Sequence, residues 1–164
     1  MVELRIVGSD DWTQWRTLRL AALGEAPYAF SSRLADWQGD GDTEGRWRSR
    51  LTDVPCNVVA ELDAQPAGMV SATAPASGTT ELISMWVAPF ARGRGVGDAL
   101  IGAVVGWAGS QSARRLVVRV MVGNTAAVAL FRRHGFEDTG LVVENPDGSR
   151  EAEVARELAA PAAG

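Results

Sequence analysis

The stretch that decides the fold reads ELISMWVAPFARGRGVGDALI, residues 81–101. An apolar strand pattern is followed by a proline, a glycine-arginine loop and an apolar helix pattern. Glycines at alternate positions keep Cβ atoms out of the loop and allow positive φ. The first amides of the helix lack intrahelical partners and carry the positive end of its dipole. No acidic residue interrupts residues 82–97. We therefore predict that these amides, flanked by Arg92 and Arg94, bind a phosphate-like anion.

The spacing of the loop excludes two common nucleotide-binding motifs. The dinucleotide fingerprint G-x-G-x-x-G fails, because its third glycine would fall at Asp98. The P-loop fails because no Gly-Lys-Ser/Thr follows, and the chain contains no lysine. The spacing that fits is Arg-x-x-Gly-x-Gly, formed by Arg92, Gly95 and Gly97.

This motif resembles the acetyl-CoA signature of the GCN5-related N-acetyltransferase (GNAT) family. A second block, N-x-x-A-x-x-L-F-x-x-x-G-F over residues 124–136, looks like that family's N-x-x-A-x-x-L-Y-x-x-x-G-F segment. The two motifs stand in the family's order, about 30 residues apart, with a strand-like run between them. The resemblance covers roughly residues 1–158, with specific motifs only in about 80–136. It implies an acetyl-CoA-dependent N-acetyltransferase.

The patterns and the resemblance predict an α+β fold, with a mixed, mostly antiparallel central sheet of about six to seven strands flanked by about four helices. We expect one domain over residues 1–158 and a frayed tail over 159–164. The strands are expected at residues 2–7, 57–62, 66–74, 79–87, 116–121, 141–144 and 149–158, and the helices at 12–23, 43–51, 95–110 and 125–133. Ser9 or Asp10 is expected to cap the first helix. Because a crossover helix precedes it, strand 116–121 should run parallel to strand 79–87.

Composition narrows the partners and the compartment. The chain has 164 residues, 46% of them hydrophobic and 22% charged, as in ordinary globular proteins. Its net charge of −4 argues against nucleic acid and anionic membranes and favours a cationic acceptor. Cys56 is the only cysteine, which suits a reducing cytoplasm. No apolar run approaches 18 residues, so we expect a cytoplasmic protein without a membrane partner.

The resemblance also assigns binding residues. Those expected to hold acetyl-CoA are Trp86, Val87, Arg92, Gly93, Arg94, Gly95, Val96, Gly97, Asp98, Asn124 and Phe131. Phe30 and Trp37 are expected to line the acceptor site, because the loop between the first two helices borders that site in the family. No His, Cys, Asp or Glu cluster has metal-ligand spacing, so no metal is expected.

Acetyl transfer needs a base, because an attacking amine must first lose its proton. Glu81 is the candidate, at the start of the central strand and six residues before Val87. Even spacing puts both side chains on one face if no bulge intervenes. The alternative is that Glu81 is an exposed carboxylate at a strand end. The expected parallel strand 116–121 contains no carboxylate that could act as the base; its only charged residue is Arg119. The Val87 amide looks like the family's hydrogen-bond donor to the thioester or pantetheine arm.

One position departs from the family pattern. The family often has tyrosine where Phe131 stands, and the tyrosine hydroxyl protonates the leaving thiolate. Phenylalanine cannot donate this proton. A general acid for the thiolate is therefore absent, unnecessary or supplied by Tyr28, Ser84 or water. A thiolate with an intrinsic pKa of roughly 8.5 can leave without a dedicated acid. We expect the Phe131 ring to pack against the pantetheine arm.

The sequence thus predicts transfer of an acetyl group from acetyl-CoA to a primary amine, with a small cationic amine as the expected acceptor. Two alternatives stay open: a protein N-terminus or lysine as acceptor, and a non-catalytic acyl-CoA-binding sensor. A homodimer is also left open. The identity of the amine and the acyl-chain preference are not encoded in any motif.

Overall fold

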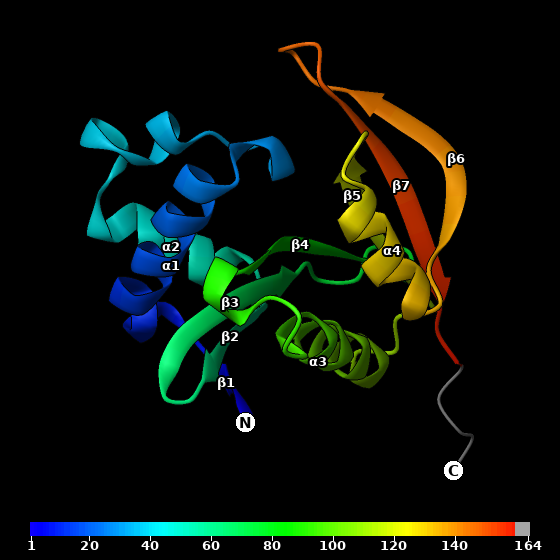
Figure 1. Ribbon diagram of the computed structural model, residues 1–164, viewed down its shortest axis with the longest axis horizontal. Helices are drawn as coiled ribbons and strands as arrows, with labels where there is room; N and C mark the ends of the chain where they lie inside the picture. Colours follow the sequence, from blue (N-terminus) through cyan, green and yellow to red (C-terminus); the bar gives the residue numbers. More distant parts are fainter. Residues whose placement is uncertain (160–164) are drawn as a thin grey trace.

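The computed structural model describes residues 1–159, so the expectation of a frayed tail lies outside the described residues from 160 onward. Among the described residues, seven strands form one sheet in the order β1-β2-β3-β4-β5-β7-β6 (Figure 1). The strands are β1 (Val2–Ile6), β2 (Cys56–Leu62), β3 (Gln65–Ala72), β4 (Thr79–Val87), β5 (Arg115–Met121), β6 (Glu137–Glu144) and β7 (Arg150–Glu157). The α-helices are α1 (Trp12–Glu25), α2 (Glu44–Asp53), α3 (Val96–Ser110) and α4 (Thr125–Arg133). The expected mixed, mostly antiparallel sheet flanked by helices is confirmed.

Every neighbouring pair of strands is antiparallel except β4 and β5. These two run parallel and are joined by α3, as the crossover argument predicted. Their pairing is short, because it extends only from Thr79 and Arg115 to Leu82 and Val118. The sheet is therefore weakly joined at its middle, between a half built from β1–β4 and a half built from β5–β7.

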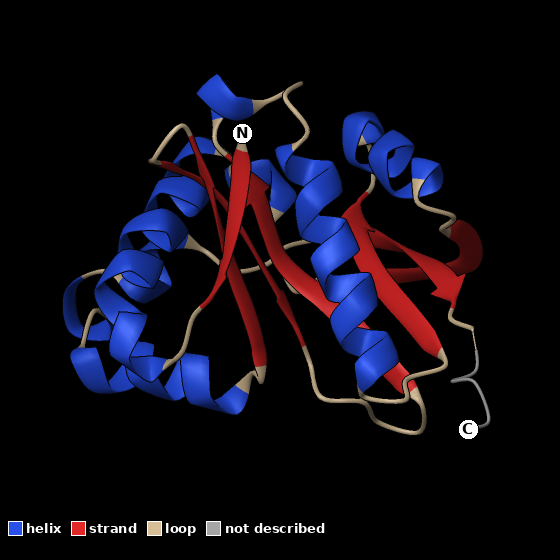
Figure 2. Cartoon of the chain, turned by 90° about the horizontal axis from the view of Figure 1, so that it is seen from below, coloured by secondary structure: helices blue, strands red, loops and turns tan. Residues whose placement is uncertain are grey.

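The helices cover both faces of the sheet (Figure 2). Helices α1 and α2 share a buried core with one face of β2–β4, which includes Trp15, Trp47 and Trp86. Helices α3 and α4 contribute Leu100 and Phe131 to a second core on the other face. Because both of its faces are covered, β2 is almost continuously buried, and its sequence CNVVAEL shows no alternation of polar and apolar residues.

Two helices begin at side-chain caps. The Thr43 hydroxyl accepts a hydrogen bond from the Arg46 amide at the start of α2. The Asn124 side chain accepts from the Ala127 amide at the start of α4. Such caps satisfy amides that have no partner inside the helix. They fix the direction in which α2 and α4 leave the loops that border the site described below.

The structure corrects three local expectations. Ser9 and Asp10 do not cap α1; they belong to a 3-10 turn, and the cap position is Asp11. Strand β6 starts at Glu137, earlier than residues 141–144. It is exposed along almost its whole length, and its register against β7 shifts between Asp138 and Val142. An exposed, irregular edge strand has no periodic pattern to read, which is why its first half was missed.

The third correction concerns β4, which contains a bulge. Ser84 has φ of 56°, and the register against β3 shifts between Met69 and Ser71. Before the bulge Leu82 packs into the α3 core, whereas after it Trp86 packs into the α1–α2 core. A bulge inserts one extra residue and so exchanges the faces of the positions that follow. The Glu81 and Val87 side chains therefore lie on opposite faces.

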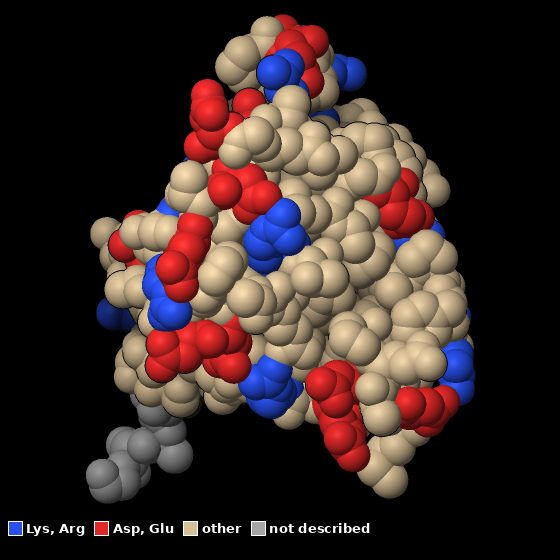
Figure 3. Space-filling view, turned by 90° about the vertical axis from the view of Figure 1, so that its left-hand side faces the viewer, with Lys and Arg blue, Asp and Glu red and all other residues tan. Residues whose placement is uncertain are grey.

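The face in Figure 3, on the side of α1 and α2, carries interspersed acidic and basic side chains without a continuous basic patch. Among the described residues, no helix is long and apolar enough to cross a membrane.

Candidate active site

A cavity of about 530 Å³ opens where β4 and β5 separate. Its size falls within the range of small-molecule sites. Its walls come from both faces of the sheet: from α1, α2 and the loop between them on one side, and from α4 on the other. The cavity thus passes through the sheet beside the bulge of β4. Such a passage lets a ligand on one face meet a second ligand on the other.

The backbone of β4 turns the Val87 amide toward this opening. The Ala88 amide donates to the Ala67 carbonyl of β3 at 2.8 Å. Because successive amides along a strand point to opposite edges, the Val87 amide points away from β3, to the side that β5 has left. The Val87 carbonyl on the same side accepts from Arg92 Nε at 3.1 Å. Val87 lines the cavity with an amide that can donate to a ligand.

Glu81 lines the cavity before the bulge and is half-buried. Burial raises the pKa of its carboxyl group. The cation of Arg119 partly opposes this rise in pKa, whereas the nearby carboxylates of Glu151 and Glu153 add to it. A carboxylate with a raised pKa is a stronger base than an exposed one. Glu81 therefore has the environment expected of a general base.

The glycine-arginine loop and the start of α3 form a cradle of free amides. Gly93 and Gly95 have φ of 74° and 86°, in the left-handed region that glycine tolerates. Within the described residues, the amides of residues 93–98 donate to no protein group. Together with the positive end of the helix dipole, they can hold an anion such as a pyrophosphate.

The charged side chains of the cradle are bound to the protein itself. Arg94 pairs with Asp63 at 3.1 Å. Asp98 accepts from Arg133 and contacts His134, at 2.9 and 2.8 Å. Of the loop and helix start, residues 92–98, only Arg92 also lines the cavity. The structure thus places the predicted residues 93–98 next to one another in the cradle, but outside the walls of the cavity.

Gly97 has a packing role as well. A Cβ atom at this position would lie 3.1 Å from Leu130 Cδ2, so the missing side chain lets α4 approach the start of α3. Leu130 lines the cavity together with Asn124 and Phe131 of the predicted set. Phe131 is buried and stacks edge-on against Phe136, with ring centroids 5.3 Å apart.

Glu25, at the end of α1, holds one residue of β4 and one residue of the glycine-arginine loop. Its Oε2 accepts from Trp86 Nε1 at 2.9 Å and from Arg92 Nη2 at 2.7 Å. The hydrogen bond from Trp86, followed by that from Arg92, lowers the pKa of Glu25, so this carboxylate stays charged. The contact fixes the indole of Trp86 and the guanidinium of Arg92 beside the cavity.

The two residues predicted for the acceptor side, Phe30 and Trp37, both line the cavity. The guanidinium of Arg19 lies 4.7 Å from the centre of the Phe30 ring. The guanidinium of Arg46 lies 3.8 Å from the Trp37 ring, whose other neighbour is Trp47 at 4.5 Å. Stacked cations and rings of this kind hold aromatic side chains in place.

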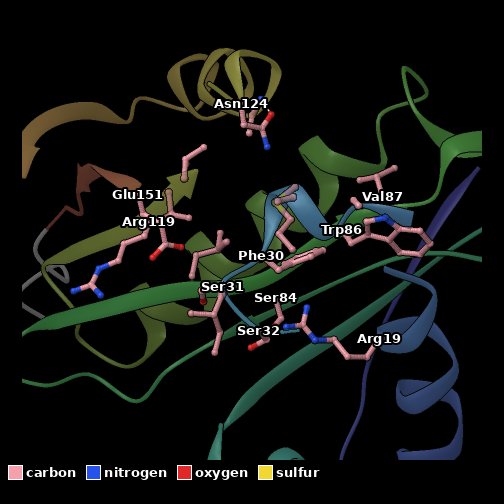
Figure 4. Close-up of a pocket in the computed structure, with 18 of the residues that line it drawn as sticks. Arg19, Phe30, Ser31, Ser32, Ser84, Trp86, Val87, Arg119, Asn124 and Glu151 are labelled. Carbon is pink, nitrogen blue, oxygen red and sulfur yellow. Dashed lines mark hydrogen bonds between the residues drawn. The ribbon is translucent and has the colours of Figure 1, made fainter. Parts of the chain in front are cut away.

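Sequence reasoning missed several lining residues, above all Arg19 and Arg50 on the acceptor side and Glu151 of β7. A signal for Arg19 existed, because it stands four residues after Trp15 and four before Leu23, in the middle of the apolar stripe of α1. No comparable signal marks Glu151, which reaches the cavity only through the pairing of β7 with β5. Figure 4 shows Arg19 and Glu151 on opposite sides of the cavity, with Phe30, Ser31 and Ser84 between them.

No group of three or more His, Cys, Asp or Glu residues in the described part of the chain could hold a metal ion.

Comparison with known proteins identifies the family. A family model described as Acetyltransferase (GNAT) family matches residues 13–136. The yncA protein of Salmonella typhimurium, solved with its cofactor acetyl-CoA, is similar with a TM-score of 0.75 and 18% identity over 100% of this chain and 98% of that one. A GNAT-superfamily phosphinothricin acetyltransferase of Sinorhizobium meliloti, in complex with AcCoA, has a TM-score of 0.72 and 20% identity, covering 96% and 88% of the two chains.

The ribosomal-protein-S18-alanine N-acetyltransferase of Escherichia coli also has a TM-score of 0.72, with 16% identity over 98% of this chain and 96% of that one. At these identities the likeness shows the fold alone. A search of curated proteins found no match.

Proposed function

The chain belongs to the acetyltransferase (GNAT) family, and on this premise we propose that it transfers the acetyl group of acetyl-CoA to a small primary amine by direct attack on the thioester. We further propose that residues 1–158 act as one catalytic domain. The observation that carries the proposal is the cavity at the separation of β4 and β5, which joins a free amide and a half-buried carboxylate.

The donor side fits acetyl-CoA. The free amides of residues 93–98 suit its pyrophosphate, and the walls formed by Leu130 and Phe131 suit its pantetheine arm. The ligand supplies an activated acetyl group as a thioester. The Val87 amide would donate to the carbonyl oxygen of that thioester, where negative charge develops during attack. Of the other predicted residues, Trp86 and Arg92 border this path and are held by Glu25.

Proton transfer falls to Glu81 in this proposal. The amine arrives as an ammonium ion and gives a proton to the Glu81 carboxylate, directly or through a water molecule. The free amine then attacks the carbonyl carbon, the nitrogen gives its second proton to the solvent, and the C–S bond breaks to leave the amide and the CoA thiolate. Phe131 has no hydroxyl group, so the thiolate leaves unprotonated or takes its proton from the solvent.

The fold does not choose the acceptor. The phosphinothricin and the ribosomal-protein acetyltransferases named above act on very different amines, yet both have a TM-score of 0.72 against this chain. We propose a small amine because four aromatic side chains line the acceptor side of the cavity, namely Trp15, Phe30, Trp37 and Trp47. Acetyl-CoA use and a lone buried cysteine are consistent with the expected cytoplasmic location.

A screen of primary amines tests the proposal. The protein is mixed with acetyl-CoA and each amine in turn, and free CoA is followed with a thiol reagent while the product is identified by mass spectrometry. We expect amine-dependent CoA release with one acetyl group added to the nitrogen. Tight acetyl-CoA binding without release for any small amine or peptide would instead support the sensor alternative.

A further inference from the structure

We infer that the acceptor carries an anionic group, a carboxylate, besides its amine, and that Arg19 and Arg50 form the subsite that binds it. The inference rests on the proposed acetyl transfer. It specifies that the acceptor is a zwitterion, with both an ammonium and a carboxylate group. The name anion subsite is used below for these two arginines together with Trp15, whose ring lies beside the Arg50 guanidinium.

Arg19 is the main evidence. Its side chain is only 7% exposed, yet it forms no ion pair and no side-chain hydrogen bond with any described residue. Its Nη1 is fully buried without a partner. The contact of the guanidinium is with the face of the Phe30 ring, at the wall of the cavity. A buried charge without a counterion is costly, so an arginine in this position points to a missing anion.

Arg50 adds a second uncompensated charge beside the first. It donates only to neutral oxygens: Asn57 Oδ1 at 3.0 Å, and Ser71 Oγ and Ser84 Oγ at 3.1 Å each. Burial lowers the pKa of Arg50 to about 10. The pKa of Arg19 is also lowered to about 10, by burial first and then by repulsion from Arg50. Both groups are still charged at neutral pH, so two like charges face one cavity.

A third donor in the same wall lacks a partner. Trp15 Nε1 is buried and unpaired, and Trp15 stands one helical turn before Arg19. The Arg50 guanidinium lies 5.3 Å from the Trp15 ring. All three side chains line the cavity. Buried donors normally have acceptors, and a carboxylate has two oxygens that could serve Arg19 and Trp15 together.

The opposite side of the cavity has a net negative charge, because two carboxylates there face only one cation among the described residues, Arg119. Glu81 and Glu151 both line it, and Glu151 is only 9% exposed and forms no ion pair with a described residue. Figure 4 shows Glu151 and Arg19 far apart across the cavity, with Ser31 and Ser32 between them. A molecule with an ammonium group at one end and a carboxylate at the other would neutralise both sides at once. A purely cationic amine would leave the charges of Arg19 and Arg50 without a counterion.

A binding measurement tests the anion subsite without any catalysis. The probes are straight-chain alkanoates from propanoate to octanoate, each compared with its neutral primary amide, in a buffer free of carboxylate and phosphate. Binding is measured by calorimetry and by the shift in the thermal unfolding midpoint. We expect the alkanoates to bind at least tenfold more tightly than their amides at the best chain length, as a hydrogen-bonded charge pair would give.

Two variants locate the effect. Arg19→Gln removes the unpaired guanidinium, and we expect it to abolish the preference for alkanoates. Arg33→Gln removes the same charge from an exposed side chain that does not line the cavity, and should leave the preference intact. If Arg19→Gln does not fold, the wild-type comparison of alkanoate with amide still decides. Equal binding of the two, or no binding of either, would overturn the inference.

A kinetic measurement tests the acceptor class. The ω-amino acids from glycine to ε-aminocaproate are compared with their primary amides, which keep size but lack the charge. The ratio of kcat/KM for acid over amide should reach at least tenfold at the best length and fall to near one in Arg19→Gln. Amines acetylated without any such preference would leave the proposed function standing and refute the zwitterionic acceptor. Alkanoate binding that depends on Arg19, without acetylation of any amine, would refute the proposed function and keep the anion subsite.

Discussion

Arg50 donates from Nη2 to Ser84 Oγ at 3.1 Å, which ties helix α2 to the residue where β4 bulges. The bulge lies just beyond the point where β4 and β5 part, since their pairing ends at Leu82 and Val118. The same guanidinium lines the acceptor side of the cavity. Helix α2 thus both supports the opening in the sheet and contributes charge to it.

The bulge can be tested at Ser84. A β-branched residue is poorly tolerated at φ of 56°, so Ser84→Val should destabilise the protein by about 1–3 kcal/mol. It also removes the acceptor for Arg50, and we expect acetyl-CoA affinity to fall because the Val87 amide is no longer held toward the opening. Denaturant unfolding and calorimetric titration measure the two effects. Thr79→Val, at the start of β4 and outside the walls of the cavity, should leave affinity unchanged. Similar behaviour of both variants would exclude a special role for the bulge.

Glu81→Gln should separate activity from stability. Without the carboxylate, kcat should fall by about 10²-fold or more, while acetyl-CoA affinity changes little. Because the folded-state pKa of Glu81 is raised, ionising this group disfavours the folded state as pH rises from the unfolded pKa through the folded one. The variant should therefore be at least as stable as the wild type at neutral pH, with the difference vanishing in acid. The exposed Glu137→Gln is the control. Full activity of Glu81→Gln would mean that Glu81 is not the base.

The acid limb of the pH profile should report Glu81. The base must be ionised, so kcat/KM should decline as pH falls through its raised pKa. Arg119 lowers the pKa of Glu81 and Glu153 raises it. Arg119→Gln should therefore move the acid limb to higher pH, and Glu153→Gln to lower pH. All profiles are recorded with the same acceptor, so that the titration of the amine affects every protein equally. Shifts of the acid limb in the same direction in both variants would contradict the assignment.

The cradle predicts that acetyl-CoA affinity depends on Gly95, the N-cap of α3, but not on Gly102 inside the helix. Gly95 has φ of 86°, where alanine is strained by roughly 1–2 kcal/mol, and its Cβ would extend into the open space where the anion is proposed to bind. Gly95→Ala should weaken acetyl-CoA binding by at least tenfold. Gly102→Ala, inside the helix with nothing within 4 Å of the added atom, should stabilise the helix slightly and leave binding unchanged. Calorimetric titration of both proteins decides, and equal affinities would rule out the cradle.

The variant Phe131→Tyr tests whether the missing general acid for the CoA thiolate limits the rate. If thiolate departure limited the rate, a new hydroxyl group would raise kcat by up to about 10²-fold. We expect a change of no more than about threefold, because a CoA thiolate leaves readily and other steps limit turnover. The measurement is kcat against pH for both proteins with one acceptor. A tenfold loss would mean instead that the hydroxyl disturbs the packing against Phe136, whose ring centroid is 5.3 Å away.

Much of the fold was accessible from the sequence because its signals are local. Strand β4, the glycine loop and α3 were predicted from residues 81–101, and the parallel pairing of β4 with β5 followed from the crossover helix. Strand β6 was predicted only in part, because an exposed edge strand with an irregular register carries no burial pattern. On the cofactor side, Asn124 and Phe131 were named from a motif, and both line the cavity.

The sequence by itself determined the family, the glycine loop at the start of α3 and the carboxylate at the start of β4, since each depends on residue type and short spacing. The tertiary structure decided which charges share the cavity. The bulge at Ser84 exchanges the faces of β4, so the spacing between Glu81 and Val87 could not place their side chains. Arg19, Arg50 and Glu151 come from three distant segments, and only the packing of α1, α2 and β7 around the opening brings them to one site. Such long-range placement depends on how buried surfaces fit together, which no local pattern records.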